Sequence, residues 1–151
     1  MKNKKVIQGK EIISKANFLS LNREASIAMK NDQKLNNDAK KLLARADEYR
    51  WIHQSTWFGE PLLNLPQDMF AIQEIIWKTK PDYIIEVGVC WGGSILFEAM
   101  LLDFIGGKKL IGIDIFIPDD LKKRLNNNKK LIDKIQLIEG DSTANDTIKK
   151  I

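Results

Sequence analysis

The sequence has a single cysteine and a single histidine among its 151 residues. One cysteine excludes a disulfide framework and a cysteine-rich zinc site, and it suits a reducing compartment, so we expect a cytoplasmic protein. No apolar run approaches the roughly 18 residues that a membrane-spanning helix needs, and the N-terminus lacks the uninterrupted apolar stretch of a signal peptide. A Ser-His-Asp triad would have to use His53, which we interpret instead as a connector residue.

An excess of basic residues is confined to the first part of the chain. Residues 1–60 contain 12 Lys and Arg against 7 Asp and Glu, whereas residues 61–151 contain 12 against 13. A nucleic-acid site would need clustered basic residues with aromatic residues among them on one face, and the Lys pairs of this chain are scattered. We therefore interpret the net charge of +4 as solvated surface, and expect neither a nucleic-acid nor a membrane partner.

The hydrophobic pattern divides the chain into three parts. Residues 1–50 have a modest helical periodicity and predict a helical N-terminal appendage. Residues 51–66 combine a glycine and two prolines with Trp51, Trp57 and Phe58, which predicts a packed aromatic connector that clasps the core. Residues 67–151 alternate between the two periodicities, with helices expected at 67–78, 94–105 and 121–131 and strands at 83–88, 110–116 and 135–138.

Strands that alternate with helices predict an α/β fold with a doubly wound, Rossmann-like parallel sheet. Three parallel strands leave the flank of the first strand unpaired, although such sheets are normally covered on both faces and extended on both sides. We therefore expect residues 67–151 to form one half of a domain. Either further chain or a second chain would supply the missing strands.

The turn between the first predicted strand and its helix carries the strongest chemical signal. In an open α/β sheet this turn lies at the edge where ligands bind, and the helix that follows offers free N–H groups to an anion. Gly88 and Gly93 fit the first and third places of the dinucleotide motif G-x-G-x-x-G, but Cys90 occupies the second, where a side chain would obstruct a pyrophosphate. An acid at Glu86 and a hydroxyl at Ser94 favour a ligand that carries an amino group and a carboxylate.

The same turn resembles motif I of class I S-adenosylmethionine-dependent methyltransferases, in the form E-x-G-x-x-x-G-x-S. Over residues 56–142 the chain is similar to the cephalosporin hydroxylase family, whose members have the methyltransferase fold and include sugar O-methyltransferases. The matching motifs are Thr56-Trp57-Phe58-Gly59, Pro66-Gln67-Asp68, Gln73-Glu74-Ile75-Ile76, Lys80-Pro81-Asp82, Glu86-Val87-Gly88, Gly92-Gly93-Ser94, Ile111-Gly112-Ile113-Asp114-Ile115 and Leu137-Ile138-Glu139-Gly140-Asp141-Ser142.

The resemblance implies a set of cofactor-binding residues at the ends of the three predicted strands. Glu86 would contact the methionine end, Asp114 would accept hydrogen bonds from the ribose hydroxyls, and Asp141 would accept one from the adenine amino group. Asp141 and Ser142 are open to a second interpretation, as N-caps of a final helix. The complete set is Glu86, Gly88, Gly92, Gly93, Ser94, Asp114, Asp141 and Ser142, in which the N–H groups of residues 92–94 and the hydroxyl of Ser94 would hold the cofactor carboxylate.

The function that the resemblance implies is S-adenosylmethionine-dependent O-methylation of a small-molecule or sugar hydroxyl. This chain would hold the cofactor-binding half, and its catalytic residues are unassigned. The sequence leaves open whether the chain is active by itself and whether it forms a homo-oligomer. Where the family uses Mg²⁺, the metal ligands would follow a fourth strand beyond residue 151, so no metal ligand is assigned here. Two alternatives are a non-catalytic truncated α/β module and, less favoured, an NAD(P)-binding oxidoreductase half.

Overall fold

The computed structural model describes residues 14–127 and 129–151, and it divides into two compact units between Tyr49 and Arg50. The first unit contains helices α1 (Lys15–Asn31) and α2 (Gln33–Asp47). Ser14 caps α1 by accepting the N–H of Asn17, and Asp32 caps α2 by accepting that of Leu35, which satisfies N–H groups that lack intrahelical partners. Residues 1–13 of the predicted appendage lie outside the described residues.

The second unit opens with a small hairpin that the sequence pattern does not predict. A 3-10 helix (Trp51–His53) leads into strands β1 (Thr56–Trp57) and β2 (Glu60–Pro61), which pair antiparallel. The two residues between them, Phe58 and Gly59, have φ angles of 50° and 90°. Positive φ at both positions suits a tight hairpin turn, and strands of two residues are too short to produce an alternating pattern.

A three-stranded parallel sheet forms the centre of this unit, and the predicted α/β fold is confirmed. Its strands lie in the consecutive order β3-β4-β5, so that Ile85 pairs with Ile111 and Ile113 pairs with Ile138. The elements after the hairpin are α3 (Pro66–Thr79), β3 (Tyr83–Val87), α4 (Gly93–Phe104), β4 (Lys109–Asp114), α5 (Asp119–Asn126), β5 (Ile135–Glu139) and α6 (Asn145–Ile148), with a second 3-10 helix at Ile132–Lys134.

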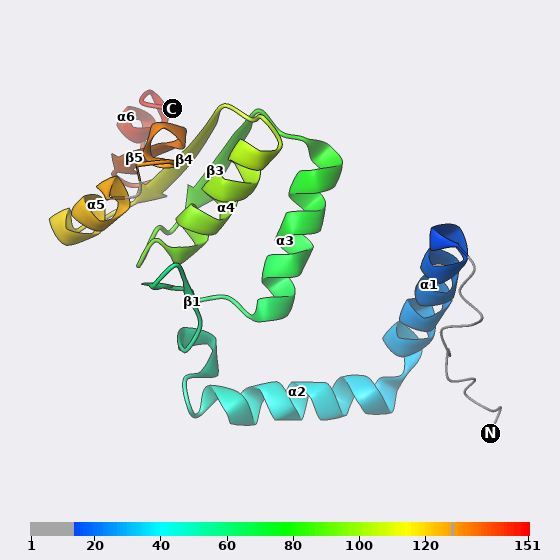
Figure 1. Ribbon diagram of the computed structural model, residues 1–151. Helices are drawn as coiled ribbons and strands as arrows, with labels where there is room; N and C mark the ends of the chain where they lie inside the picture. Colours follow the sequence, from blue (N-terminus) through cyan, green and yellow to red (C-terminus); the bar gives the residue numbers. More distant parts are fainter. Residues whose placement is uncertain (1–13, 128) are drawn as a thin grey trace, which may run out of the picture. The chain divides into compact units, whose positions relative to one another are not determined.

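The main core lies where α4 and α5 pack against one face of the sheet. Ile95 and Leu102 of α4 share a buried cluster with Leu121 of α5 and with Leu110 and Ile135 of the strands. Figure 1 shows α3 beside α4, and the two helices are in contact. Because β3, β4 and β5 pair in parallel, their carboxyl ends meet at the same edge of the sheet.

Two predicted boundaries are wrong, for local reasons. Strand β4 ends at Asp114 rather than at Phe116, because the N–H of Phe116 turns back onto the Asp114 carboxylate (3.2 Å). Helix α5 ends at Asn126 rather than at residue 131, within a run of asparagines, which have low helix propensity. Asn128 of the predicted helix lies outside the described residues.

Candidate functional site

Two adjoining hollows open where the strands end. We call the first the β3 hollow; it has a volume of about 250 Å³, and Glu86, Gly88, Gly92 and Ser94 line it together with Asn64 from the segment after the hairpin. The hollow lies at the N-terminus of α4, where a helix offers N–H groups that have no partner within the helix. Four of the eight predicted residues are therefore brought together at one point.

The second hollow, which we call the β4–β5 hollow, has a volume of about 210 Å³. Gly88, Asp114, Asp141 and Ser142 line it, and it shares Val87 and Gly88 with the β3 hollow. The strand ends thus place Asp114, the last residue of β4, and Asp141, which follows β5, around one space. Seven of the eight predicted residues line one hollow or both.

Glu86 is the half-buried acid of the β3 hollow. The Ser94 hydroxyl donates a hydrogen bond of 2.5 Å to its Oε1, while Oε2 is buried and accepts no hydrogen bond from the described residues. Burial raises the pKa of Glu86 from 4.5 to about 7, and the hydrogen bond from Ser94 opposes that rise. A cationic group placed beside Oε2 would favour the ionised carboxylate and supply its missing partner.

A second half-buried acid, Glu98, was missed by the sequence analysis. It lies one helical turn beyond Ser94 in α4, and its Oε2 also has no partner in the part of the chain that the structure describes. Burial, and then the charge of Glu86, raise the pKa of Glu98 to about 7. The signal in the sequence was an acid in the middle of an otherwise apolar helix, which is costly without a purpose.

The loop between β3 and α4 turns through residues with left-handed backbone, namely Gly88, Cys90 and Gly92 (φ 95°, 48° and 84°). The N–H of Cys90 donates to Oδ2 of Asp114 (3.1 Å), so the loop is tied to the end of β4. The N–H of Gly92 donates to the carbonyl of Val89 (2.9 Å) and is therefore not free for a carboxylate. The implied role of that N–H group is wrong, and Gly92 contributes its positive φ instead.

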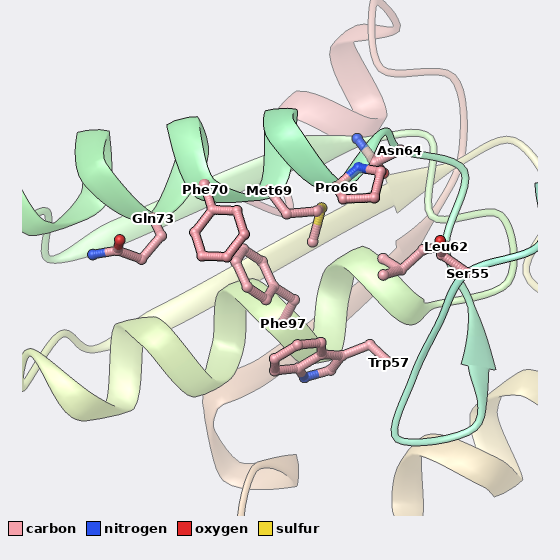
Figure 2. Close-up of a pocket in the computed structure, with 9 residues that line it drawn as sticks. All are labelled: Ser55, Trp57, Leu62, Asn64, Pro66, Met69, Phe70, Gln73 and Phe97. Carbon is pink, nitrogen blue, oxygen red and sulfur yellow. The ribbon is translucent and has the colours of Figure 1, made fainter. Parts of the chain in front are cut away.

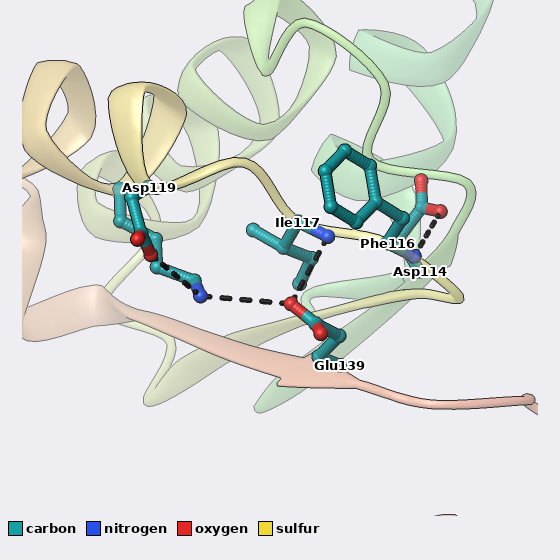
Figure 3. Close-up of polar contacts among 6 residues, drawn as sticks. Asp114, Phe116, Ile117, Asp119 and Glu139 are labelled. Carbon is teal, nitrogen blue, oxygen red and sulfur yellow. Dashed lines mark hydrogen bonds and ion pairs between the residues drawn. The ribbon is translucent and has the colours of Figure 1, made fainter.

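Asp114 is held in a fixed orientation by two backbone N–H groups. Cys90 donates to one carboxylate oxygen and Phe116 to the other, and each oxygen keeps a second lone pair for a ligand. Figure 3 shows how the segment after Asp114 is fixed: the N–H of Ile117 donates to Glu139 at the end of β5 (3.2 Å). Lys122 joins the same carboxylate at 3.5 Å, so the ends of β4 and β5 are cross-linked.

Asp141 is fully exposed and is oriented by its own turn. Its Oδ1 accepts both the N–H and the hydroxyl of Thr143, each at 2.8 Å, and these bonds hold the pKa of Asp141 below its usual range. Helix α6 begins at Asn145 with Ala144 at its N-cap. The alternative interpretation, in which Asp141 and Ser142 cap the final helix, is therefore wrong.

Gly93 is required by packing rather than by a ligand. A Cβ there would lie 2.4 Å from the carbonyl oxygen of Pro61 and 2.8 Å from that of Glu60, so only glycine lets the start of α4 approach the hairpin. Glu60 in turn accepts two hydrogen bonds from Arg124 of α5, at 2.9 and 3.1 Å. The unpredicted hairpin is thus fixed on both sides, and the segment that follows it supplies Asn64 to the site.

The aromatic residues of the connector divide in two. Trp57 packs edge-on against Phe97 of α4 (5.0 Å between ring centroids), as the clasp interpretation predicts, whereas Phe58 is largely exposed. Within residues 14–127 and 129–151, no group of three or more His, Cys, Asp or Glu side chains is placed to hold a metal ion. None of the helices in that part of the chain is long and apolar enough to cross a membrane.

Residues 49–151 match the model of the family Rhamnosyl O-methyltransferase/CmcI. The chain belongs to this family. The expected resemblance to the cephalosporin hydroxylase family is thereby confirmed. A curated relative, the Rhamnosyl O-methyltransferase of Mycobacterium leprae (strain TN), is 36% identical over 78 residues, covering 46% of this chain and 34% of the relative.

Two solved structures of CmcI are similar to the chain. One, with Mg and S-adenosylmethionine, has a TM-score of 0.50 and 25% identity, and covers 66% of this chain and 41% of that structure. The other, an apo-structure, has a TM-score of 0.52 and 25% identity, and covers 65% of this chain and 40% of that structure. The chain thus spans less than half the length of the relatives it matches.

Proposed function

We propose that this chain binds S-adenosylmethionine at the ends of β3, β4 and β5, as the cofactor-binding part of an O-methyltransferase that acts on a small-molecule or sugar hydroxyl. Membership of the family supports this proposal, as do a relative named for rhamnosyl O-methylation and a CmcI structure that contains S-adenosylmethionine. The observation that carries it is the pair of adjoining hollows, which bring Glu86 and Ser94 close to Asp114 and Asp141.

The β3 hollow fits the amino acid end of this cofactor. The unpartnered Oε2 of Glu86 would accept a hydrogen bond from the ammonium group and carry the opposite charge. The backbone N–H groups of Gly93 and Ser94, in the first turn of α4, would hold the carboxylate with help from the helix dipole. The Ser94 hydroxyl already donates its proton to Glu86, so it orients the acid rather than binding the carboxylate.

The β4–β5 hollow fits the adenosine end. Both oxygens of Asp114 are oriented by backbone N–H groups and keep lone pairs, which would accept the two ribose hydroxyls. Oδ2 of Asp141 accepts no hydrogen bond from the described residues, and it would accept one from the adenine amino group, with Ser142 beside it. A backbone without a side chain at Gly88, which lines both hollows, leaves room where the two ends of the ligand meet.

When bound, the cofactor would supply the methyl group of its sulfonium: the sulfur–carbon bond would break as the acceptor oxygen forms its bond to that carbon, leaving a neutral thioether, and the acceptor's proton would pass to solvent. Such an in-line displacement asks the protein mainly to position the two partners and exclude water. This chain would bind and orient the methyl donor through Glu86, Ser94, Asp114 and Asp141. One CmcI structure contains Mg, and we assign no residue of the present chain as a ligand of that metal.

Calorimetric titration of the full chain with S-adenosylhomocysteine tests this proposal. We expect binding that Asp114→Ala weakens by about tenfold or more, because two hydrogen bonds to a charged group are lost. Asp133→Ala is the matched control, since Asp133 is exposed and lines neither hollow. Binding of NAD in place of S-adenosylhomocysteine would support an oxidoreductase half, and binding of neither would support a non-catalytic module.

A further inference from the structure

A third hollow, almost entirely apolar, lies between α3 and α4, and the proposed function leaves it without a role. Its volume is about 280 Å³. We call it the aromatic hollow, because Trp57 of the hairpin, Phe70 of α3 and Phe97 of α4 form its walls, with Leu62 and Met69 between them. Figure 2 shows these side chains around the hollow, with the indole of Trp57 next to Phe97.

The aromatic hollow adjoins the β3 hollow. Asn64 lines both of them, so the two hollows meet at this residue. Helix α4 gives a second link, because Ser94 lines the β3 hollow and Phe97, three residues later on the same side of the helix, lines the aromatic hollow. A group in the aromatic hollow would therefore extend toward the place where the methyl donor is proposed to lie.

We propose that the aromatic hollow binds an aromatic group of the methyl acceptor, an inference that rests on the proposed function. Aromatic rings pack favourably edge to face, and the wall is already built that way, with Trp57 and Phe97 at an interplanar angle of 87°. The volume is slightly below the range of roughly 300–1,000 Å³ for whole-ligand pockets, so the hollow suits one ring system rather than a whole molecule.

Two amide side chains of this hollow are available to orient the acceptor. Neither Asn64 nor Gln73 has a side-chain hydrogen bond with the residues that the structure describes, and both line the hollow. Asn64, at the boundary with the β3 hollow, is placed to hold the acceptor hydroxyl, while the ring lies among carbon atoms. A bare sugar would lose its hydrogen bonds to water against these walls, so the hollow favours an aryl-bearing acceptor.

The probe is 2-naphthol, a hydroxyl on an aromatic body, titrated by calorimetry into the full chain in the presence of S-adenosylhomocysteine. Phe70→Ala removes one wall and should weaken binding by about tenfold. Phe104→Ala is the matched control: Phe70 and Phe104 are 74% and 77% exposed, so neither substitution removes a core residue, and Phe104 does not line the hollow. The control should bind within about twofold of the natural chain, and glucose should not bind.

A second test fills the hollow with a larger side chain instead of removing one of its walls. Gln73→Trp adds a large side chain at the wall and should abolish binding of 2-naphthol, while binding of S-adenosylhomocysteine stays unchanged. If the chain binds S-adenosylhomocysteine but 2-naphthol does not bind, or if Phe104→Ala weakens it as much as Phe70→Ala, this inference is wrong and the proposed function stands. If the natural chain does not bind S-adenosylhomocysteine, the proposed function is refuted, and the acceptor assignment with it.

Discussion

Replacing Glu86 with glutamine should raise the free energy of unfolding and lower the affinity for S-adenosylhomocysteine. Burial raises the pKa of Glu86 from 4.5 to about 7, so ionising this carboxyl costs the folded state free energy that the unfolded chain does not lose. At about 1.4 kcal/mol for each pKa step of one, and allowing for partial exposure and for coupling to Glu98, the cost is about 2–3 kcal/mol. Glu86→Gln cannot ionise and therefore avoids it.

The pH dependence has a defined sign. A raised pKa in the folded state means that the folded chain binds this proton more tightly than the unfolded chain does. The favourable contribution is present below pH 4.5 and is lost as the pH rises through about 7. Since about a quarter of this cost is already present at pH 5, the free energy of unfolding of Glu86→Gln, relative to the natural chain, should rise by about 1.5–2 kcal/mol between pH 5 and pH 8.

Urea denaturation at pH 5 and pH 8 measures this difference. Subtracting the two stability changes cancels any effect of the new amide that does not depend on pH. Glu74→Gln is the control, because Glu74 is exposed and forms only a surface ion pair with Lys78 (3.3 Å), worth about 0.5 kcal/mol or less. The same Glu86→Gln protein should lose affinity for S-adenosylhomocysteine at pH 8, since the negative partner of the ammonium group is gone. Equal pH dependence in the two variants and the natural chain would refute the burial argument.

Three further predictions concern the loop and its neighbours. Gly93→Ala should lower the free energy of unfolding by about 1–3 kcal/mol, because its methyl group would collide with the backbone of Pro61, and urea denaturation measures this loss. Cys90→Gly should raise stability by up to about 1 kcal/mol in the same assay, since Cys90 has a φ of 48°. Asp114→Asn should keep the fold but weaken S-adenosylhomocysteine binding in calorimetry by about tenfold, and unchanged binding would exclude the ribose role.

The sheet could be predicted because its signals are local. Strands β3, β4 and β5 are short apolar runs bounded by glycine or charged residues. Helix α3 begins with Pro66, and proline is favoured at the first position of a helix. The meeting of Glu86, Asp114 and Asp141 also followed from sequence, because parallel strands bring their carboxyl ends to one edge. The cofactor roles assigned to these residues remain predictions.

The hairpin and the helix packing could not be predicted, because contacts distant in sequence determine them. Strands β1 and β2 have two residues each, and their position depends on the ion pair between Glu60 and Arg124, which are 64 residues apart. Gly93 was interpreted as part of a ligand-binding motif, yet its nearest neighbour is the carbonyl of Pro61. A motif gives the residue type that a position needs and leaves open whether a ligand or a neighbouring segment imposes it.

These long-range contacts give the connector a part in the site that its composition did not suggest. Because Gly93 lets β2 approach the start of α4, the residues that follow β2 are carried to the edge of both the β3 hollow and the aromatic hollow, where Asn64 lies. A bulky residue at position 93 would push the hairpin outward and widen both spaces together. Binding of S-adenosylhomocysteine and of 2-naphthol should therefore weaken in parallel in Gly93→Ala, whereas Phe70→Ala should affect 2-naphthol alone.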